Sequence, residues 1–88
     1  MKFYKFYADW CGPCKVLTTN LRRAGVTNYE PINVDKEENE PLVVAYNIRN
    51  IPVFIAVKEE NGVENEVDRF VGIKSPDAIK QWVEALNE

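Results

Sequence analysis

The order of hydrophobic and polar positions along this 88-residue chain predicts a set of β-strands. The aromatic-rich segment Lys2 to Ala8 has the composition of a strand. The apolar run Pro52 to Val57 is unbroken, which predicts a central strand covered on both faces. Tyr29 to Val34 is a further expected strand, and Pro31 places it at a sheet edge, because proline cannot donate to a neighbouring strand.

A fourth strand is expected over Val63 to Val71, after the turn signal Asn61-Gly62. This segment mixes acidic residues with Val67 and Phe70, a composition typical of an edge strand protected by charge. The short link also predicts that this strand pairs antiparallel with the one before it.

Apolar residues spaced three or four apart predict three helices. Gly25 ends the first helix, whose inward positions are Cys14, Leu17, Leu21 and Ala24. The second is short and opens at Asn39 or Glu40, with Pro41 in its first turn; its expected inward residues are Leu42, Ala45 and Tyr46.

The third helix has the clearest start signal, because Ser75 can cap it and Pro76 suits its first position. Its expected apolar face is Ile79, Trp82, Val83 and Leu86, with Trp82 in the core. The whole order is strand–helix–strand–helix–strand–strand–helix. A right-handed crossover makes the first two strands parallel. We therefore predict an α/β fold, βαβαββα, with a mixed four-stranded sheet, helices on both faces, and a single domain over residues 1–88.

Composition narrows the functional classes. At 10.2 kDa and 45% hydrophobic, the chain has the size and make-up of one globular domain. No apolar run reaches the ~18–20 residues that span a bilayer, so no membrane association is expected. The N-terminus does not read as a signal peptide, and we expect a cytoplasmic location.

The formal charge of −3 argues against a nucleic-acid binder, which is usually basic. Residues 1–24 hold five basic residues against one acid, a bias that a solvated helix face explains as well as an anionic partner does. The chain has no histidine, which excludes Ser-His-Asp and Cys-His catalysis. It also leaves few ligands for zinc, and no metal site is expected.

The strongest chemical signal is Cys11-Gly12-Pro13-Cys14 at a predicted strand–helix junction. Zinc sites use the same spacing, but in this setting it favours a redox pair. A structural disulfide is disfavoured, because so short a loop restricts the unfolded chain little.

At a helix start, the Cys11 sulfur lies near unpaired N–H groups and the positive end of the helix dipole. We expect this setting to lower the pKa of Cys11 from ~8.5 toward neutrality. Cys11 then attacks a target disulfide, and Cys14, one turn on and shielded, resolves the mixed disulfide. Pro13 stiffens the turn, and Gly12 lets a substrate backbone approach.

Three segments resemble the thioredoxin family: Phe6 to Lys15 around the cysteines, Ile51-Pro52 before the apolar strand, and Phe70-Val71-Gly72. The resemblance covers essentially the whole chain, but the usual N-terminal strand and helix are missing. It implies a minimal thioredoxin-like fold and a disulfide reductase with no cofactor beyond the Cys11–Cys14 disulfide. It also implies a monomer, a thioredoxin reductase-like electron donor drawing on NADPH, and disulfide-containing client proteins.

The resemblance also assigns roles in a substrate groove. An Xaa-Pro bond is usually trans, but the family implies a cis bond at Pro52 that faces the cysteines. The backbone of Ile51 would then pair with an extended substrate, and Gly72 would lie beside the groove. Trp10 is either a core aromatic or a flat wall beside the nucleophile, and its position next to Cys11 favours the wall.

The chain departs from the family at Lys5, where most thioredoxins carry a buried aspartate, and at Pro31, in place of a partner lysine. Three interpretations of Lys5 stay open. Its ammonium reaches water while its stem packs, or it stays charged near Cys14 and favours the thiolate. In the third, burial lowers its pKa until it serves as a base.

Two other functions stay open at the level of sequence. A glutaredoxin-like reductase would draw on glutathione; small size favours it, whereas Gly12-Pro13 and the lack of a paired glycine at Val71-Gly72 favour thioredoxin. A thioredoxin-like binding module would keep the surface and dispense with both cysteines.

Overall fold

The strands and helices follow one another in the predicted βαβαββα order, with one added 3-10 turn, η1, before the second helix. The computed structural model describes residues 1–87. The element bounds are β1 (Lys2–Tyr7), α1 (Gly12–Arg23), β2 (Glu30–Asn33), η1 (Glu37–Asn39), α2 (Glu40–Ala45), β3 (Val53–Glu60), β4 (Val63–Val71) and α3 (Pro76–Leu86).

The four strands form one mixed sheet in the order β2-β1-β3-β4. β1 pairs parallel with β2 and antiparallel with β3, and β3 pairs antiparallel with β4. The central position of β3 and the edge positions of β2 and β4 are therefore confirmed. Pro31 lies on the edge strand β2, in register with Lys5 of β1. An edge strand has a neighbour on one side only, so it tolerates a residue that has no N–H to donate.

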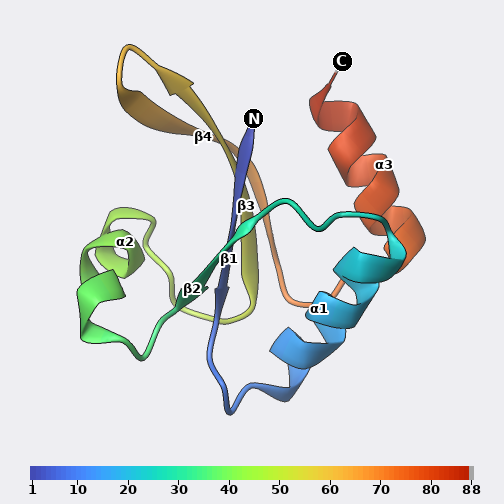
Figure 1. Ribbon diagram of the computed structural model, residues 1–88, viewed down its shortest axis with the longest axis horizontal. Helices are drawn as coiled ribbons and strands as arrows, with labels where there is room; N and C mark the ends of the chain where they lie inside the picture. The colour runs from blue at the N-terminus through green and yellow to red at the C-terminus, as the bar shows by residue number, and fades with distance from the viewer. Residues whose placement is uncertain (88) are drawn as a thin grey trace.

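Helices cover both faces of the sheet, as predicted. In Figure 1, α2 lies on one side of the strands, and α1 and α3 lie on the other. Phe6 and Ile55 belong to the core on the α2 side, whereas Phe54 packs with Leu17 of α1 and Ile79 of α3. Phe54 and Ile55 are neighbours on β3 and serve opposite faces, because side chains alternate along a strand.

The start of α3 follows its sequence signal. The hydroxyl of Ser75 accepts a hydrogen bond from the N–H of Ala78 at 3.1 Å, and Pro76 occupies the first turn. Such a cap satisfies an N–H that the helix itself cannot pair. The predicted N-cap is confirmed.

Two details of packing differ from the expectations. Ala45 is exposed, and Val43 packs against the core beside Leu42 and Tyr46 instead, because the buried stripe of the short α2 extends from Leu42 and Tyr46 toward Val43 and not toward Ala45. Trp82 is half-buried and not fully in the core, because its indole N–H reaches out to the carboxylate of Asp68 at 2.9 Å. A buried indole usually needs such a partner.

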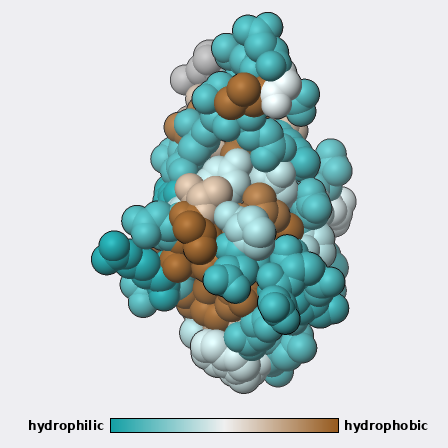
Figure 2. All heavy atoms as spheres, turned by 90° about the vertical axis from the view of Figure 1, so that its left-hand side faces the viewer, coloured by the Kyte–Doolittle hydropathy of each residue, from teal (hydrophilic) through white to brown (hydrophobic). Residues whose placement is uncertain are grey.

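The face that carries α2 shows a group of apolar atoms surrounded by hydrophilic ones (Figure 2). Val44 of α2 is among the exposed apolar residues of the chain. Within residues 1–87, none of the helices combines the length and the apolar character needed to cross a bilayer.

Candidate active site

Cys11 and Cys14 are joined by a disulfide at the start of α1, with their Cα atoms 5.3 Å apart. The exposed fraction is 4% for Cys11 and 2% for Cys14. The expected shielding of Cys14 is confirmed. The two cysteines pack with Ala8 in a small cluster that Val34 and Ile51 border.

Cys11 is the N-cap residue of α1, and its sulfur accepts a hydrogen bond from the N–H of Cys14 at 3.1 Å. Gly12 and Pro13 form the first turn, so the helix begins inside the motif. A sulfur in this position faces the unpaired N–H groups and the positive end of the helix dipole, both of which favour a negative charge. A Cβ added at Gly12 would meet nothing within 4 Å, so another molecule can approach the backbone at this point.

The Ile51–Pro52 peptide bond is cis, as the resemblance implies. Ile51 packs against the cysteine cluster, which places the residue before the proline beside the disulfide. The carbonyl of Pro52 accepts a hydrogen bond from the N–H of Gly72 at 2.8 Å. Gly72 has a φ of 88°, a conformation that glycine adopts without strain. The structure thus joins the proline and glycine segments next to the cysteines.

Trp10 is 72% exposed, so it is not a core aromatic. Its indole N–H donates to the carboxylate of Asp35 at 2.7 Å. This bond holds the ring at the surface, immediately before Cys11. A cavity of about 260 Å³ lies beside it, and its lining includes Trp10, Val34, Val43, Ile48 and Ile51.

Lys5 is 6% exposed, and its ammonium donates a hydrogen bond to the hydroxyl of Thr18 on α1. The ammonium also lies 5.0 Å from the centre of the Tyr7 ring and 5.6 Å from that of Tyr29. Burial lowers the pKa of Lys5. The burial of Lys5 and its hydrogen bond to Thr18 disfavour an ammonium that reaches water, and the other two interpretations of Lys5 stay open.

Two residues near the cysteines were missed by the sequence analysis. Thr18 accepts from Lys5 and donates to the carbonyl of Cys14 at 3.0 Å. Asp35 orients Trp10. The only sequence signal for them was position: Thr18 lies one helical turn after Cys14, and Asp35 follows shortly after the end of β2. Neither position in the sequence indicates which residue the side chain contacts, so these contacts are visible only in the folded chain.

A second cavity touches Cys14 from the side of Lys5. It measures about 180 Å³, and its lining includes Lys5, Tyr7, Asp9, Cys14, Lys15 and Thr18. In the described part of the chain, no group of three or more His, Cys, Asp or Glu side chains is placed to hold a metal ion.

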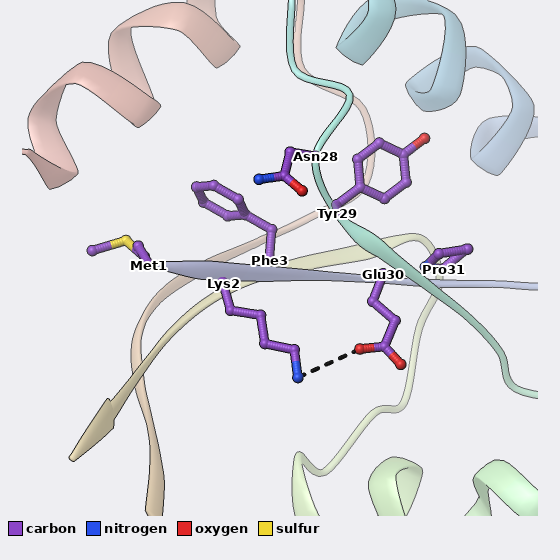
Figure 3. A pocket seen from close by; sticks show the side chains of 7 residues that line it. All are labelled: Met1, Lys2, Phe3, Asn28, Tyr29, Glu30 and Pro31. Carbon is purple, nitrogen blue, oxygen red and sulfur yellow. Dashed lines mark ion pairs between the residues drawn. The ribbon is translucent and has the colours of Figure 1, made fainter.

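A larger cavity of about 400 Å³ lies at the opposite end of β1, between the starts of β1 and β2. Figure 3 shows its lining, with the ammonium of Lys2 paired to the carboxylate of Glu30 at 3.5 Å. The lining contains neither cysteine. The chemistry of the chain is therefore concentrated at the end of the sheet where α1 begins.

The comparisons with known proteins agree on one family. The family model described as Thioredoxin matches residues 3–85. The mitochondrial thioredoxin of Mus musculus is 33% identical over 84 residues, which are 92% of this chain and 48% of that protein. The thioredoxin of Chlamydia trachomatis serovar D is 34% identical over 76 residues, 84% of this chain and 71% of that protein.

A solved structure of a mutant thioredoxin from Halobacterium salinarum is similar with a TM-score of 0.74 and 34% identity. The match covers 98% of this chain and 74% of that one. This chain spans about half the length of the mouse relative. The match over residues 3–85 includes the cysteine pair, the cis-proline and Gly72, and on these grounds the chain belongs to the thioredoxin family.

Proposed function

We propose that this chain, as a single thioredoxin-like domain, is a thiol–disulfide oxidoreductase that reduces protein disulfides through Cys11 and Cys14. The observation that carries the proposal is the Cys11–Cys14 disulfide at the N-terminus of α1, where the Cys11 sulfur accepts the N–H of Cys14. The same hydrogen bond and the helix dipole stabilise a thiolate at Cys11 once the disulfide is reduced.

The reaction follows from these positions. The Cys11 thiolate attacks a sulfur of the client disulfide, and the other client sulfur leaves with the electron pair. The Cys14 thiolate then attacks the Cys11 sulfur, the bond to the client breaks, and the Cys11–Cys14 disulfide forms. The client gains two electrons and the dithiol loses them. Gly12 and Pro13 place the two cysteines one helical turn apart, with their Cα atoms 5.3 Å apart, so that their sulfurs are close enough for the second attack.

We assign the groove around the cysteines to client binding. The exposed ring of Trp10 forms one wall. Ile51 lies against the cysteine cluster on another side and is followed by the cis-proline Pro52. Gly72 is bonded to Pro52 and completes this side. We assign to the backbone of Ile51 the pairing with an extended client segment, as a strand pairs with its neighbour.

The partners follow from the same reaction. A dithiol that becomes oxidised in each cycle needs an electron donor, and family membership favours a reductase of the kind that serves thioredoxins. Disulfide-containing proteins are the clients. The cytoplasmic location and the monomeric state stay predictions; the name of the mouse relative places that protein in mitochondria.

The test is reduction of insulin disulfides by the full chain, supplied with NADPH and a thioredoxin reductase. We expect turnover in the wild type, none with Cys11→Ser, and trapped mixed disulfides with Cys14→Ser. A matched control, Thr27→Cys, adds an exposed thiol in the segment between α1 and β2 and restores nothing to the Cys11→Ser protein.

Two results would contradict the proposal. Activity toward a glutathione mixed disulfide with glutathione as the only donor, without insulin reduction, would indicate the glutaredoxin-like alternative. Full client binding and no turnover in the wild type, unchanged when both cysteines become serine, would indicate a binding module.

A further inference from the structure

Lys5 is a buried titratable group that the exchange reaction described above does not use. It lies on the face of β1 that α1 covers, with its ammonium bonded to Thr18. None of the ion pairs among residues 1–87 includes Lys5. A buried ammonium without a carboxylate partner is rare, because burial disfavours the charged form.

The surroundings of Lys5 lead to the resolving cysteine. Lys5 and Cys14 line the same cavity of about 180 Å³. Thr18 connects them from the side, because its hydroxyl accepts from Lys5 and donates to the carbonyl of Cys14 at 3.0 Å. A space of this size has room for water, and the polar groups of Lys5 and Thr18 at its edge offer that water hydrogen-bond partners. Such a water can carry a proton between an amine and a thiol.

Among the titratable groups around this cavity, Lys5 is the one best placed to accept the proton of the Cys14 thiol. On β1 and before β2, the rings of Tyr7 and Tyr29 face its ammonium. Asp9 and Lys15 also line the cavity, but both are exposed. The pKa of Lys5 is lowered by burial, which brings the neutral amine closer to working pH.

We infer that Lys5 takes the proton of the Cys14 thiol across this cavity during resolution of the mixed disulfide. This inference rests on the proposed function and adds one step to it. The neutral amine becomes an ammonium and the thiol becomes a thiolate. The thiolate attacks the Cys11 sulfur, the Cys11–Cys14 bond forms, and the client sulfur leaves with the electron pair. The ammonium then returns its proton to the leaving thiolate or to water.

A two-step probe separates this inference from the proposed function. The reduced protein is mixed with the aromatic disulfide dithiobisnitrobenzoate in a stopped-flow instrument. Attack by Cys11 releases the first thionitrobenzoate anion, and resolution by Cys14 releases the second. Loss of the first release would overturn the proposed function, whereas the second release alone reports on Lys5.

With Lys5→Met we expect the first release to stay within about twofold of wild type. The second slows at least tenfold at pH 7, because general acid–base catalysis contributes ~10²–10⁴-fold. Its rate also levels off at a higher pH than in wild type. Lys80→Met is the matched control, since Lys80 is an exposed residue of α3 and its loss changes the net charge equally. A second release as fast in Lys5→Met as in Lys80→Met would overturn the inference.

A measurement on proteins that keep Lys5 covers the case in which Lys5→Met fails to fold. The ¹³Cε signal of Lys5 is followed by NMR against pH in the reduced wild type and in Cys14→Ser. Two coupled groups share their titration, so we expect the Lys5 midpoint to lie at least one pH unit higher in the wild type, where thiolate can form beside it. Equal midpoints in the two proteins, or a Lys5 that stays charged above pH 10 in both, would overturn the inference.

Discussion

Replacing Lys5 by Met is expected to stabilise the oxidised protein at neutral pH. The side chain of Lys5 is 6% exposed, and methionine has a similar length without the charge. Exchange of buried ion pairs for apolar groups of similar volume is often neutral or gains about 1–4 kcal/mol, and we take this range as the guide for the buried ammonium. The lost hydrogen bond to Thr18 offsets about 1 kcal/mol of this gain. We therefore expect the free energy of unfolding to rise by about 0–3 kcal/mol at pH 7.

The pH dependence supplies a sharper form of this prediction. Burial lowers the pKa of Lys5 in the folded chain, whereas the unfolded chain has the ordinary value of ~10.4. Between these two values the unfolded state binds more protons, so wild-type stability rises with pH by up to ~1.4 kcal/mol per pH unit. Below the folded-state pKa, the penalty of burying the charge is present in full. The advantage of Lys5→Met should therefore shrink as the pH rises toward 10.

Guanidinium unfolding of the oxidised proteins between pH 6 and pH 10.5 measures both effects. The Lys80→Met protein serves as the control for net charge, because that side chain is exposed. The reasoning is refuted if Lys5→Met is less stable than wild type at pH 7 and the difference stays constant over this pH range. A constant difference would mean that Lys5 titrates alike in the folded and unfolded chains.

Three further predictions concern other parts of the molecule. Phe54→Ala should cost about 3–5 kcal/mol in urea unfolding, because Phe54 is fully buried and contacts rings on several elements; a loss below 1 kcal/mol would contradict the packing. Asp35→Ala should raise the KM for insulin about fivefold with kcat little changed, because ~1 kcal/mol of orientation for Trp10 is lost; an unchanged KM argues against the Trp10 wall. Hydrogen bonds, of which the one from Tyr4 has the largest effect, hold the pKa of Glu64 below its usual range. The charged carboxylate of Glu64 therefore stabilises the fold in full above the unfolded-state pKa of ~4.3, and this contribution is lost as the pH falls through the folded-state pKa. Glu64→Gln should thus be less stable than wild type at pH 7 and nearly equal to it at pH 2–3, measured by urea unfolding; a difference that persists in acid would contradict the role of its charge.

Much of the fold could be predicted from local patterns. Pro31 predicted an edge strand, the apolar run before Lys58 predicted a central one, and Ser75-Pro76 predicted the start of α3. These signals are local, because each depends on the conformational preference or periodicity of a few neighbouring residues. The buried stripe of α2 shows the limit, since in six residues the periodicity alone does not separate Val43 from Ala45.

The site divides in the same way. The sequence alone determined that two cysteines share one turn at a helix start, since a strand, the motif and a helix are consecutive in the chain. Only the tertiary structure decided three hydrogen bonds around the site. They join Trp10 to Asp35, Gly72 to Pro52, and Lys5 to Thr18. These contacts join residues from different elements, so their geometry depends on how the helices pack on the sheet, and no local pattern encodes it.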